Sequence, residues 1–386
     1  MNDAAAPHEP PTLANLGRWF ATAADDAGAD AAPSDAVGAT AGPIDPAPPG
    51  AVAASAPRAS RGLPRMPAWG PDPRGGYGQV SDEATVLAAL SVLRDAGRGA
   101  QPADRNAAPG VQPADGGAEE RPARRGVTVI TGAGVSTGSG LPDYRGANAV
   151  ARAPMTVQEF TGSDLSRRRY WARSTVGWTQ FLRARPGLAH TRLAALTAPL
   201  GIRAVITQNV DSLHQCAGSP HVIDLHGRLD TIVCLACRAR FDRQAHHARL
   251  LAMNPQVAEQ IDALAADAAQ APDGDAEVDR THDFRYPPCP LCGGMLKPDV
   301  VFFGEGAARA DVEAGFAAVD ESAAVLVLGS SLTVMSGLRF VRRAEKLGRP
   351  VVVVNDGPTR ADDLAEVRVH GRVEAVLGRW LAALEA

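Results

Sequence analysis

Five short apolar runs, each followed by glycine-rich or polar sequence, limit the fold of this chain more than any other feature. They lie at residues 127–130, 204–207, 222–225, 325–328 and 351–354. Each run is too short for a helix and nearly apolar throughout, as strands of a parallel sheet buried on both faces are. Helical patterns lie between several of them, at residues 190–200, 311–319 and 338–347. Strands that alternate with helices predict an α/β fold built on a doubly wound, Rossmann-like parallel sheet.

Two stretches outside these runs are poor in large apolar residues. Residues 1–77 and 98–124 are rich in Ala, Pro, Gly and Asp, and they cannot bury enough surface to offset the entropy of ordering. We therefore predict a disordered tail at 1–77, with a short helix near residues 16–21, and a loose insertion at 98–124 within one large domain spanning 78–386.

A helical pattern separates these two stretches. Acidic residues follow Ser81 in the first turn, and Gly97 can end the helix. The apolar residues at helical spacing, which predict the buried face, are Val86, Leu87, Leu90 and Leu93.

Charge and hydropathy exclude several classes of protein. The formal net charge is −4, which gives no reason to expect nucleic acid as the main ligand. No apolar run approaches the roughly 18–20 residues that span a bilayer, so we predict no membrane partner. The first 50 residues hold seven acids and one basic residue, Arg18, and fit neither a secretory signal nor a mitochondrial presequence. We therefore expect a cytoplasmic protein.

Four of the five cysteines form two matched pairs. Cys234 and Cys237 make one CxxC knuckle, and Cys289 and Cys292 make the other. The odd count, which leaves Cys216 over, argues against a disulfide framework. Paired knuckles are typical of a tetrahedral Zn²⁺ site, and four thiolates leave no open position, so the predicted site is structural. Unrelated reduced cysteines and a CxxC redox pair remain as alternatives.

The two cysteine pairs bracket residues that break the strand–helix rhythm. An Ala- and Asp-rich portion at 262–279 lies between them. We predict that residues 228–296 form a smaller zinc-binding module inserted into the sheet domain, and that residues 146–200 form a helical module.

A glycine-rich loop at residues 131–140 directly follows the first predicted strand. Glycines at the carboxyl end of a strand let backbone N–H groups approach a phosphate, aided by the N-terminus of a following helix. The dinucleotide fingerprint requires glycine where the chain has Thr137, which argues against an ordinary dehydrogenase. A turn without a ligand remains the alternative. The next residues, Asp143, Tyr144 and Arg145, predict a segment that closes over the ligand.

Polar residues follow the next two strands. Gln208, Asn209 and Asp211 come after the second run, where side chains point into the crevice that binds ligands in doubly wound folds. A helix cap with solvated polar groups is the alternative there. His226 ends the third run beside a glycine, and the near-neutral pKa of histidine suits it to take a proton from a hydroxyl.

The last two runs also end in small or polar residues. These are residues 329–331 and 355–357. Each alone fits a turn as well as a ligand contact, but both would lie at the same edge of the sheet as the other motifs.

Taken in order, these motifs resemble the sirtuin family. RRRYWARS, the long gap between the cysteine pairs and GPTRADDL are most similar to the class II branch. The departures are Ser330, where threonine is common, and Gly138, where glutamate is frequent. The resemblance does not extend to 1–77 or 98–124. It is carried, within residues 132–359, by GAGVSTGSGLPDYRG, TQNVDSLH, DLHG, the two CxxC pairs, KPDVVFFGE, GSSL and VVNDGPT.

The resemblance implies a set of NAD contacts and two catalytic residues. His226 would be the general base, and Asn209 would act in the earlier step on NAD. Residues 297–305 would include a strand that pairs with an extended acyl-lysine peptide. The implied NAD-binding residues are Gly132, Ala133, Gly134, Asp143, Tyr144, Arg145, Gln208, Asn209, Val210, Asp211, Gly329, Ser330, Ser331, Asn355, Asp356 and Gly357.

The implied activity is NAD-dependent protein lysine deacylation. NAD would be a consumed co-substrate, and the products would be free lysine, nicotinamide and O-acyl-ADP-ribose. Mono-ADP-ribosyl transfer to protein and a non-enzymatic NAD-sensing scaffold are alternatives. Tyr170 and Arg173, three apart on a predicted helix, resemble a pairing found in sirtuins that remove acidic acyl groups. A solvated basic helix face is the other interpretation of these two residues.

Overall fold

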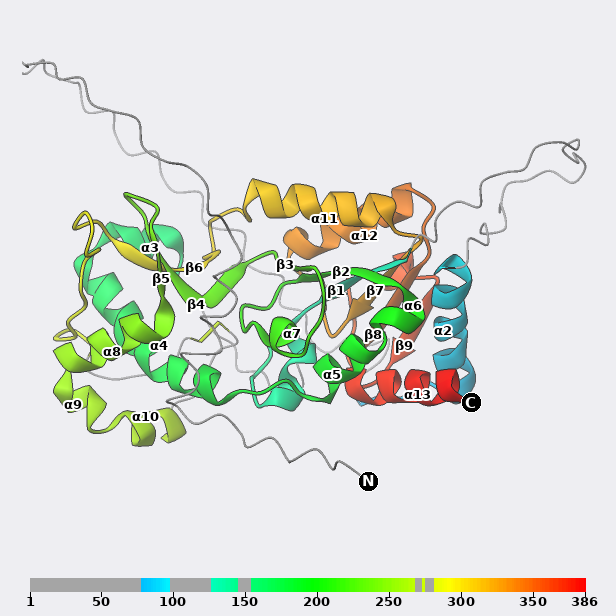
Figure 1. Cartoon of the computed structure of the whole chain (residues 1–386), viewed down its shortest axis with the longest axis horizontal. Coiled ribbons are helices and arrows are strands. Elements are labelled where there is room, and N and C mark those ends of the chain that lie inside the picture. Colours follow the sequence, from blue (N-terminus) through cyan, green and yellow to red (C-terminus); the bar gives the residue numbers. More distant parts are fainter. Residues whose placement is uncertain (1–77, 98–125, 145–153, 268–272, 275–280) are drawn as a thin grey trace, which may run out of the picture. The chain divides into compact units, whose positions relative to one another are not determined.

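The computed structural model describes most of the chain beyond residue 77 (Figure 1). The predictions for 1–77, for 98–124 and for Arg145 lie outside the described residues. Within the described part, no helix is both long enough and apolar enough to cross a membrane. The described ranges are 78–97, 126–144, 154–267, 273–274 and 281–386.

A six-stranded sheet organises the larger core (Figure 1). Its strand order is β3-β2-β1-β7-β8-β9, and every neighbouring pair is parallel, which confirms the doubly wound α/β prediction. All five predicted strands are present. The sequence analysis missed β9, because its short VRVH sequence alternates instead of being continuously apolar. The strands are β1 (Val127–Thr131), β2 (Ile202–Thr207), β3 (Val222–Asp224), β7 (Ala324–Leu328), β8 (Val351–Asn355) and β9 (Val367–His370).

Helices cover both faces of this sheet, because its central strands are apolar on both sides (Figure 1). Along β1, Val129 packs in one core cluster and the next residue, Ile130, packs in another on the opposite face. Both side chains are fully buried. The first face is covered by α2 (Glu83–Gly97), α5 (Leu188–Ala195) and α13 (Val373–Glu385), and the second by α11 (Arg309–Glu321) and α12 (Met335–Lys346).

Two helix predictions differ in detail from the structure. Helix α2 is present, and the Asp82 carboxylate caps its start by accepting a hydrogen bond from the Thr85 N–H at 2.8 Å. Leu87, which was predicted on the buried face of this helix, is 36% exposed. The helix predicted at 190–200 is interrupted, because Pro199 has no N–H to continue the hydrogen-bond ladder. The short helices in this core are α6 (Thr197–Leu200), α7 (Leu213–Cys216) and the 3₁₀ helix η3 (Asp362–Leu364).

A three-stranded antiparallel sheet, in the order β5-β4-β6, carries a second apolar core. Phe160 of α3, Trp171 of α4 and Leu250 of α8 are fully buried in it. The described residues within 154–183 and 227–300 thus contribute to one core, which is separate from the cores of the large sheet. The elements are α3 (Val157–Gly162), α4 (Asp164–Arg183), β4 (Gly227–Cys234), β5 (Arg240–Asp242), α8 (Arg243–Met253), α9 (Pro255–Ala258), α10 (Ile261–Asp267) and β6 (Leu296–Val300).

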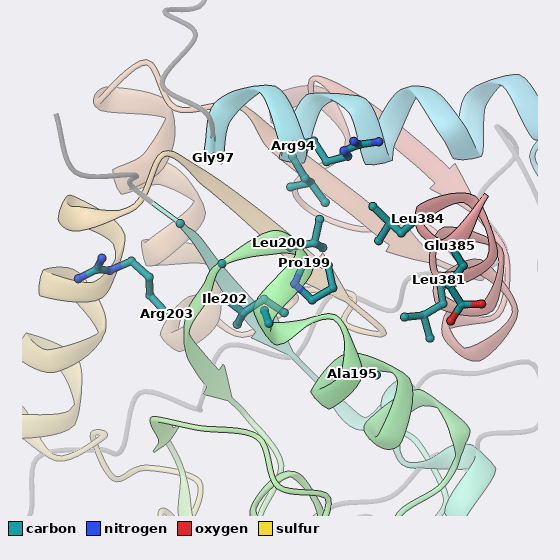
Figure 2. A pocket seen from close by; sticks show the side chains of 14 residues that line it. Arg94, Gly97, Ala195, Pro199, Leu200, Ile202, Arg203, Leu381, Leu384 and Glu385 are labelled. Atoms are coloured by element: carbon teal, nitrogen blue, oxygen red, sulfur yellow. The ribbon is translucent and has the colours of Figure 1, made fainter. Parts of the chain in front are cut away.

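A pocket of about 660 Å³ lies at the amino ends of β1 and β2 (Figure 2). Gly126 and Ile202, at the starts of these strands, line it together with Leu93 of α2, Leu200 of α6 and Leu384 of α13. Doubly wound sheets bind their ligands at the carboxyl ends of the strands. This pocket is therefore at the opposite edge of the sheet from the predicted site residues.

Candidate active site

The large sheet has its topological switch point between β1 and β7. From β1 the chain continues to β2 and β3 on one side, and β7, β8 and β9 lie on the other. In doubly wound folds, ligands bind in the crevice at the carboxyl ends of the two strands that flank this point. Gly132 follows β1 and Gly329 follows β7, so two of the predicted glycine motifs lie at this crevice.

The loops after β1 and β7 contact each other through their backbones. The Gly134 N–H donates to the Gly329 carbonyl oxygen at 2.9 Å. A Cβ atom on Gly134 would lie 2.8 Å from that oxygen, and one on Gly132 would lie 2.7 Å from the Ser330 Cβ atom. Gly329 also has a φ of +57°, in the left-handed region that favours glycine. Close approach of the two loops therefore requires these glycines.

The first loop continues in two 3₁₀ turns, η1 (Ala133–Val135) and η2 (Thr137–Ser139). The helix N-terminus that follows β1 in the described residues 126–144 is that of a short 3₁₀ turn, with Gly132 at its N-cap. Gly140, with a φ of 81°, and Pro142 follow the second turn and do not favour a continuing helix. Backbone carbonyl oxygens already accept hydrogen bonds from several N–H groups of this loop, those of Gly132, Gly134, Val135 and Ser136.

Ser136 connects the first loop to the residues after β2. Its hydroxyl donates to the Asp211 carboxylate at 2.6 Å and accepts from the Asn209 side-chain amide at 3.0 Å. The same amide donates to the Gly132 carbonyl oxygen at 3.1 Å. Asn209 and Ser136 are 9% and 2% exposed, so this network is buried within the protein. The sequence analysis missed Ser136, because a hydroxyl among glycines carries no signal of its own.

Two buried histidines lie against this network. His214 Nε2 is 2.9 Å from Thr131 Oγ1, and His190 Nε2 is 3.4 Å from Ser136 Oγ. The two rings are 4.9 Å apart. Burial lowers the pKa of both histidines, that of His214 to about 3, so both are neutral near pH 7. Neither was predicted, since a single histidine in a helix indicates packing as readily as function.

Gln208 joins the residues after β2 to the loop after β7. Its side-chain amide donates to the Ser330 hydroxyl at 2.7 Å and to the Thr131 carbonyl oxygen at 3.3 Å. Gly337, in the first turn of α12, packs against it, because a Cβ atom there would lie 2.8 Å from Gln208 Oε1. Ser330 therefore supplies the hydroxyl that a threonine would also supply at this position.

His226 lies after β3 with both ring nitrogens paired. Nδ1 is 2.9 Å from the Gln208 carbonyl oxygen, and Nε2 is 2.8 Å from the Ser336 hydroxyl. A carbonyl oxygen only accepts hydrogen bonds, so Nδ1 carries the proton and Nε2 is the basic nitrogen. Burial lowers the pKa of His226, opposed by the Gln208 carbonyl and assisted by the charge of Arg339. The ring is therefore neutral near pH 7 and able to accept a proton.

The residues after β8 form a third part of the crevice edge. Asn355 ends the strand, and its side-chain amide donates to the Gly357 carbonyl oxygen at 2.7 Å. The Asp356 carboxylate accepts from the Gly78 N–H at 2.8 Å. Arg368 of β9 donates to the backbone carbonyl oxygens of Asn355 and Gly357 at 3.0 and 2.5 Å. The sequence analysis missed Arg368 because it missed the strand that carries it.

The other predicted NAD contacts lie in the same connecting segments. Ala133 is part of η1, and Val210, 9% exposed, follows Asn209. The Ser331 hydroxyl is 3.0 Å from the Thr333 hydroxyl in the segment between β7 and α12. Asp143 and Tyr144 follow η2, and Tyr144 is 38% exposed.

The four predicted metal ligands lie together. Their sulfur atoms are all within 4.8 Å of one another, with Cys234 3.5 Å from Cys292 and Cys237 3.8 Å from Cys289. Zn–S bonds of about 2.3 Å in a tetrahedron separate the sulfurs by about 3.8 Å, so the four thiolates fit one Zn²⁺. Four protein ligands leave no position for a substrate, which makes the site structural. Cys216 lies outside the cluster.

Gly294 allows the two cysteine knuckles to close on each other. A Cβ atom on it would lie 2.7 Å from the Ala236 Cβ and 3.0 Å from the Cys234 sulfur. Its carbonyl oxygen accepts from the Cys289 N–H at 2.8 Å, which closes the second knuckle. The knuckles are thus shaped by backbone contacts as well as by a metal.

Residues 132–336 match the model of the Sir2 family. This range covers the loops after β1, β2, β3 and β7 and both cysteine pairs. The chain belongs to the Sir2 family. The resemblance that the sequence motifs carried is thereby confirmed.

Two bacterial proteins illustrate how similar this sirtuin is to its relatives. NAD-dependent protein deacetylase 1 of Mycobacterium avium is 49% identical over 255 residues, which are 66% of this chain and 90% of that protein. NAD-dependent protein deacetylase of Xanthomonas axonopodis pv. citri is 51% identical over 246 residues, which are 63% of this chain and 82% of that protein.

Solved structures also share the fold of this sirtuin. A structure described as Sir2 with a p53 peptide and NAD⁺ has a TM-score of 0.52 and 28% identity, covering 67% of this chain and 93% of that one. Another, of Sir2 with a deacetylated p53 peptide and 3′-O-acetyl ADP ribose, has a TM-score of 0.54 and 27% identity, with the same coverage of 67% and 93%.

A partly buried ion pair holds the segment after β6 of the sirtuin in place. Lys297, 4% exposed, lies 3.0 Å from the Glu305 carboxylate and also donates to the Val300 carbonyl oxygen at 2.5 Å. The Glu305 carboxylate accepts from the Phe302 N–H at 2.7 Å. The Val301 N–H donates to the His226 carbonyl oxygen at 2.8 Å, which ties this segment to the crevice.

Proposed function

We propose that the chain is an NAD-dependent protein lysine deacylase in which His226 is the general base. The observation that carries the proposal is the state of this side chain: its Nδ1 donates to Gln208, so its Nε2 is basic, and burial keeps the ring neutral. Relatives about half identical to the chain are named NAD-dependent protein deacetylases, which supports the proposal.

In this proposal NAD is a consumed co-substrate. Residues 132–134 bind NAD from the loop after β1, and residues 329–331 and 355–357 line its adenosine end. Residues 208–211 surround the nicotinamide ribose and carboxamide, with Asn209 acting in the cleavage step. Its buried amide is already held by Ser136, so little reorganisation is needed when the ligand binds.

The proposed reaction has two stages. The acyl-lysine carbonyl oxygen attacks C1′ of the ribose as nicotinamide leaves, which gives an imidate. His226 then takes a proton from a ribose hydroxyl, and the hydroxyl oxygen attacks the imidate carbon. Water completes the transfer, and the products are free lysine and O-acyl-ADP-ribose beside the released nicotinamide.

We expect the acyl-lysine peptide to bind in extended form beside residues 301–305. This segment is anchored by the Lys297–Glu305 ion pair and reaches His226 through a backbone hydrogen bond. Phe303, 36% exposed, pairs with Thr156 in an isolated parallel bridge, and the chain then turns, because the Glu305 N–H donates to the Phe302 carbonyl oxygen at 2.9 Å. The bridge shows that the backbone at Phe303 can pair with a neighbouring strand, as strand addition requires. A p53 peptide in a related Sir2 structure supports a peptide substrate.

Product analysis tests this function. Purified protein, NAD and an acetyl-lysine peptide should give nicotinamide, deacetylated peptide and O-acetyl-ADP-ribose in equal amounts by mass spectrometry. ADP-ribosylated protein without deacetylated peptide would instead assign the chain as a transferase. NAD binding without any nicotinamide release, across acyl-lysine peptides of different chain length and charge, would assign it as an NAD-sensing scaffold.

A further inference from the structure

Helix α12 approaches the crevice more closely than a helix with ordinary side chains can. Its first turn contains Gly337, where a Cβ atom would lie 2.8 Å from the Gln208 side chain. The preceding residue, Ser336, is therefore brought within reach of His226, and its hydroxyl lies 2.8 Å from Nε2. Ser336 belongs to none of the motifs that carry the family resemblance.

The direction of this hydrogen bond follows from the other ring nitrogen. Because Nδ1 of His226 donates to the Gln208 carbonyl oxygen, the neutral ring has its single lone pair on Nε2. The Ser336 hydroxyl is therefore the donor, and its oxygen lies 2.8 Å from Nε2. A hydroxyl that gives its proton to a general base must lie at about 2.6–3.2 Å from that base. Ser336 Oγ thus meets the distance requirement for the hydroxyl oxygen of a reacting substrate.

We propose that Ser336 is a positioning residue whose hydroxyl holds the place of the reacting ribose hydroxyl on His226 until NAD binds. This inference rests on the proposed function, because it takes His226 as the base. One lone pair accepts one strong hydrogen bond, so the ribose hydroxyl and Ser336 compete for Nε2. The Gln208 carbonyl sets the base-competent tautomer, and the serine occupies Nε2 and gives up this contact when the ribose arrives.

The competition predicts an unusual effect of removing a hydroxyl from the site. Ser336→Ala should bind NAD about two- to tenfold more tightly than the natural protein, because no hydrogen bond to Nε2 has to be broken first. In a His226→Ala background the same substitution should change NAD affinity by less than about twofold, because no shared acceptor remains. Met335→Ala, the adjacent exposed position on α12, is the matched control and should leave NAD affinity unchanged in both backgrounds.

Calorimetry of NAD binding to the four proteins of this cycle measures the coupling without turnover. Weaker binding by Ser336→Ala, or an equal effect in both backgrounds, would overturn the placeholder role while leaving the proposed function intact. No NAD binding by the folded, zinc-containing natural protein would overturn the proposed function and this inference together.

A second measurement needs no substitution at His226. NMR of isotope-labelled histidine nitrogens in the NAD-free protein should show His226 as the Nδ1–H tautomer, with an Nε2 resonance that Ser336→Ala shifts and Met335→Ala does not. Addition of NAD to the natural protein should shift the same Nε2 resonance, because the hydroxyl that donates to Nε2 changes from that of Ser336 to that of the ribose. An Nε2 resonance that is insensitive to Ser336→Ala would contradict the proposal.

Discussion

The Asn209–Ser136–Asp211 network in the crevice and Arg243 in the cysteine-containing core differ in how far their buried polar groups are paired. In the crevice, Asn209 makes two side-chain hydrogen bonds, and the Ser136 hydroxyl it contacts also donates to Asp211. In the second core, Arg243 is fully buried with its guanidinium 5.3 Å from each of the Trp171 and Trp178 rings. Its Nη2 donates to α4, but its Nε and Nη1 have no hydrogen-bond partner within the described residues.

This difference separates a region formed for ligand binding from one that depends on other sources of stability. A network whose members satisfy one another is rigid before the ligand arrives, which is what catalysis by pre-placed groups requires. A buried cation with unpaired N–H groups is costly, and burial lowers the pKa of Arg243 to about 10. Aromatic packing and the metal site must offset that cost in the second core.

The largest effect should therefore follow from breaking the metal site. Cys289→Ser removes one of the four clustered thiolates, and structural zinc in such sites supplies about 10–16 kcal/mol of coupled folding and binding energy. We expect loss of zinc, unfolding of the second core and loss of activity. Metal analysis and circular dichroism measure the first two.

Cys216→Ala is the matched control, because this cysteine lies outside the cluster. It should keep one zinc per chain. A soluble, active Cys289→Ser protein without zinc would show that the second core does not depend on its metal.

Removing the proposed general base from the crevice should lower the rate of deacylation without unfolding the protein. His226→Ala should reduce deacylation about 10²–10⁴-fold, the usual contribution of a general base. Zinc content and the thermal unfolding midpoint should stay close to those of the natural protein. Steady-state rates with acetyl-lysine peptide measure the loss, and near-natural turnover would rule out the assigned role.

The same contrast explains how much the sequence alone could predict. Continuous apolar runs placed β1, β2, β3, β7 and β8. Their polar ends predicted that Asn209 and His226 lie at one edge of the sheet, because parallel strands present their carboxyl ends at one edge. The paired CxxC spacing identified the metal site, because thiolates at that spacing have few other uses.

The site residues that the sequence could not predict are those whose role depends on contacts with residues far away in the sequence. Ser136 and Ser336 are ordinary serines until folding places them 3.0 Å from Asn209 and 2.8 Å from His226. Arg368 was missed because β9 has too few apolar residues to be recognised as a strand. Such residues acquire a role only from the side chains that the fold brings to them, which local patterns do not record.

A third prediction sharpens the comparison at the boundary between the two regions. Tyr170 and Arg173 lie on α4, and the Tyr170 ring, 6% exposed, is 5.1 Å from the Phe302 ring in the segment proposed to bind the peptide. Tyr170 is therefore packed in the second core and does not lie on a solvated helix face. We predict that Arg173, three residues further along the helix, lines an acyl pocket. A guanidinium there suits an acyl chain that ends in a carboxylate.

Arg173→Met should then lower the preference for carboxylated acyl-lysine over acetyl-lysine by about 10–100-fold, the effect of losing one charge-assisted hydrogen bond. The ratio of kcat/KM for succinyl- and acetyl-lysine peptides measures it. Arg169→Met, an exposed arginine on the same helix, is the control and should leave the ratio unchanged. An unchanged ratio in Arg173→Met with activity preserved would remove Arg173 from the acyl pocket.

The two regions should respond alike to acid, because each buries neutral histidines. Burial lowers the pKa of His214 in the crevice to about 3 and that of His247 in the second core to about 4, from 6.5. Below pH 6.5 the unfolded chain binds protons that the folded chain does not, so stability is full above this pH and falls as the pH decreases. Each such histidine costs up to about 2 kcal/mol at pH 5.

Urea unfolding at pH 7 and pH 5 measures this dependence. His247→Leu should reduce the difference between the two pH values, whereas substitution of the exposed His282 by alanine should not. Equal pH dependence in the natural protein and His247→Leu would show that His247 titrates normally in the folded state.

The smallest effect should come from removing the residues that carry no motif. A protein that starts at Gly78 keeps the N–H that donates to Asp356 at 2.8 Å, and it keeps the pairing of Ser81 with His370 at 2.9 Å on both sides. Its NAD affinity and turnover should stay within about twofold of those of the full chain, as for surface changes away from any such contact.

A protein that starts at Glu83 loses these contacts and the Asp82 cap of α2, and it should unfold at a lower urea concentration and bind NAD more weakly. Parallel titration of the two truncated proteins with NAD distinguishes the outcomes: if the shorter deletion already lowers turnover while the protein stays folded, residues 1–77 take part in the site.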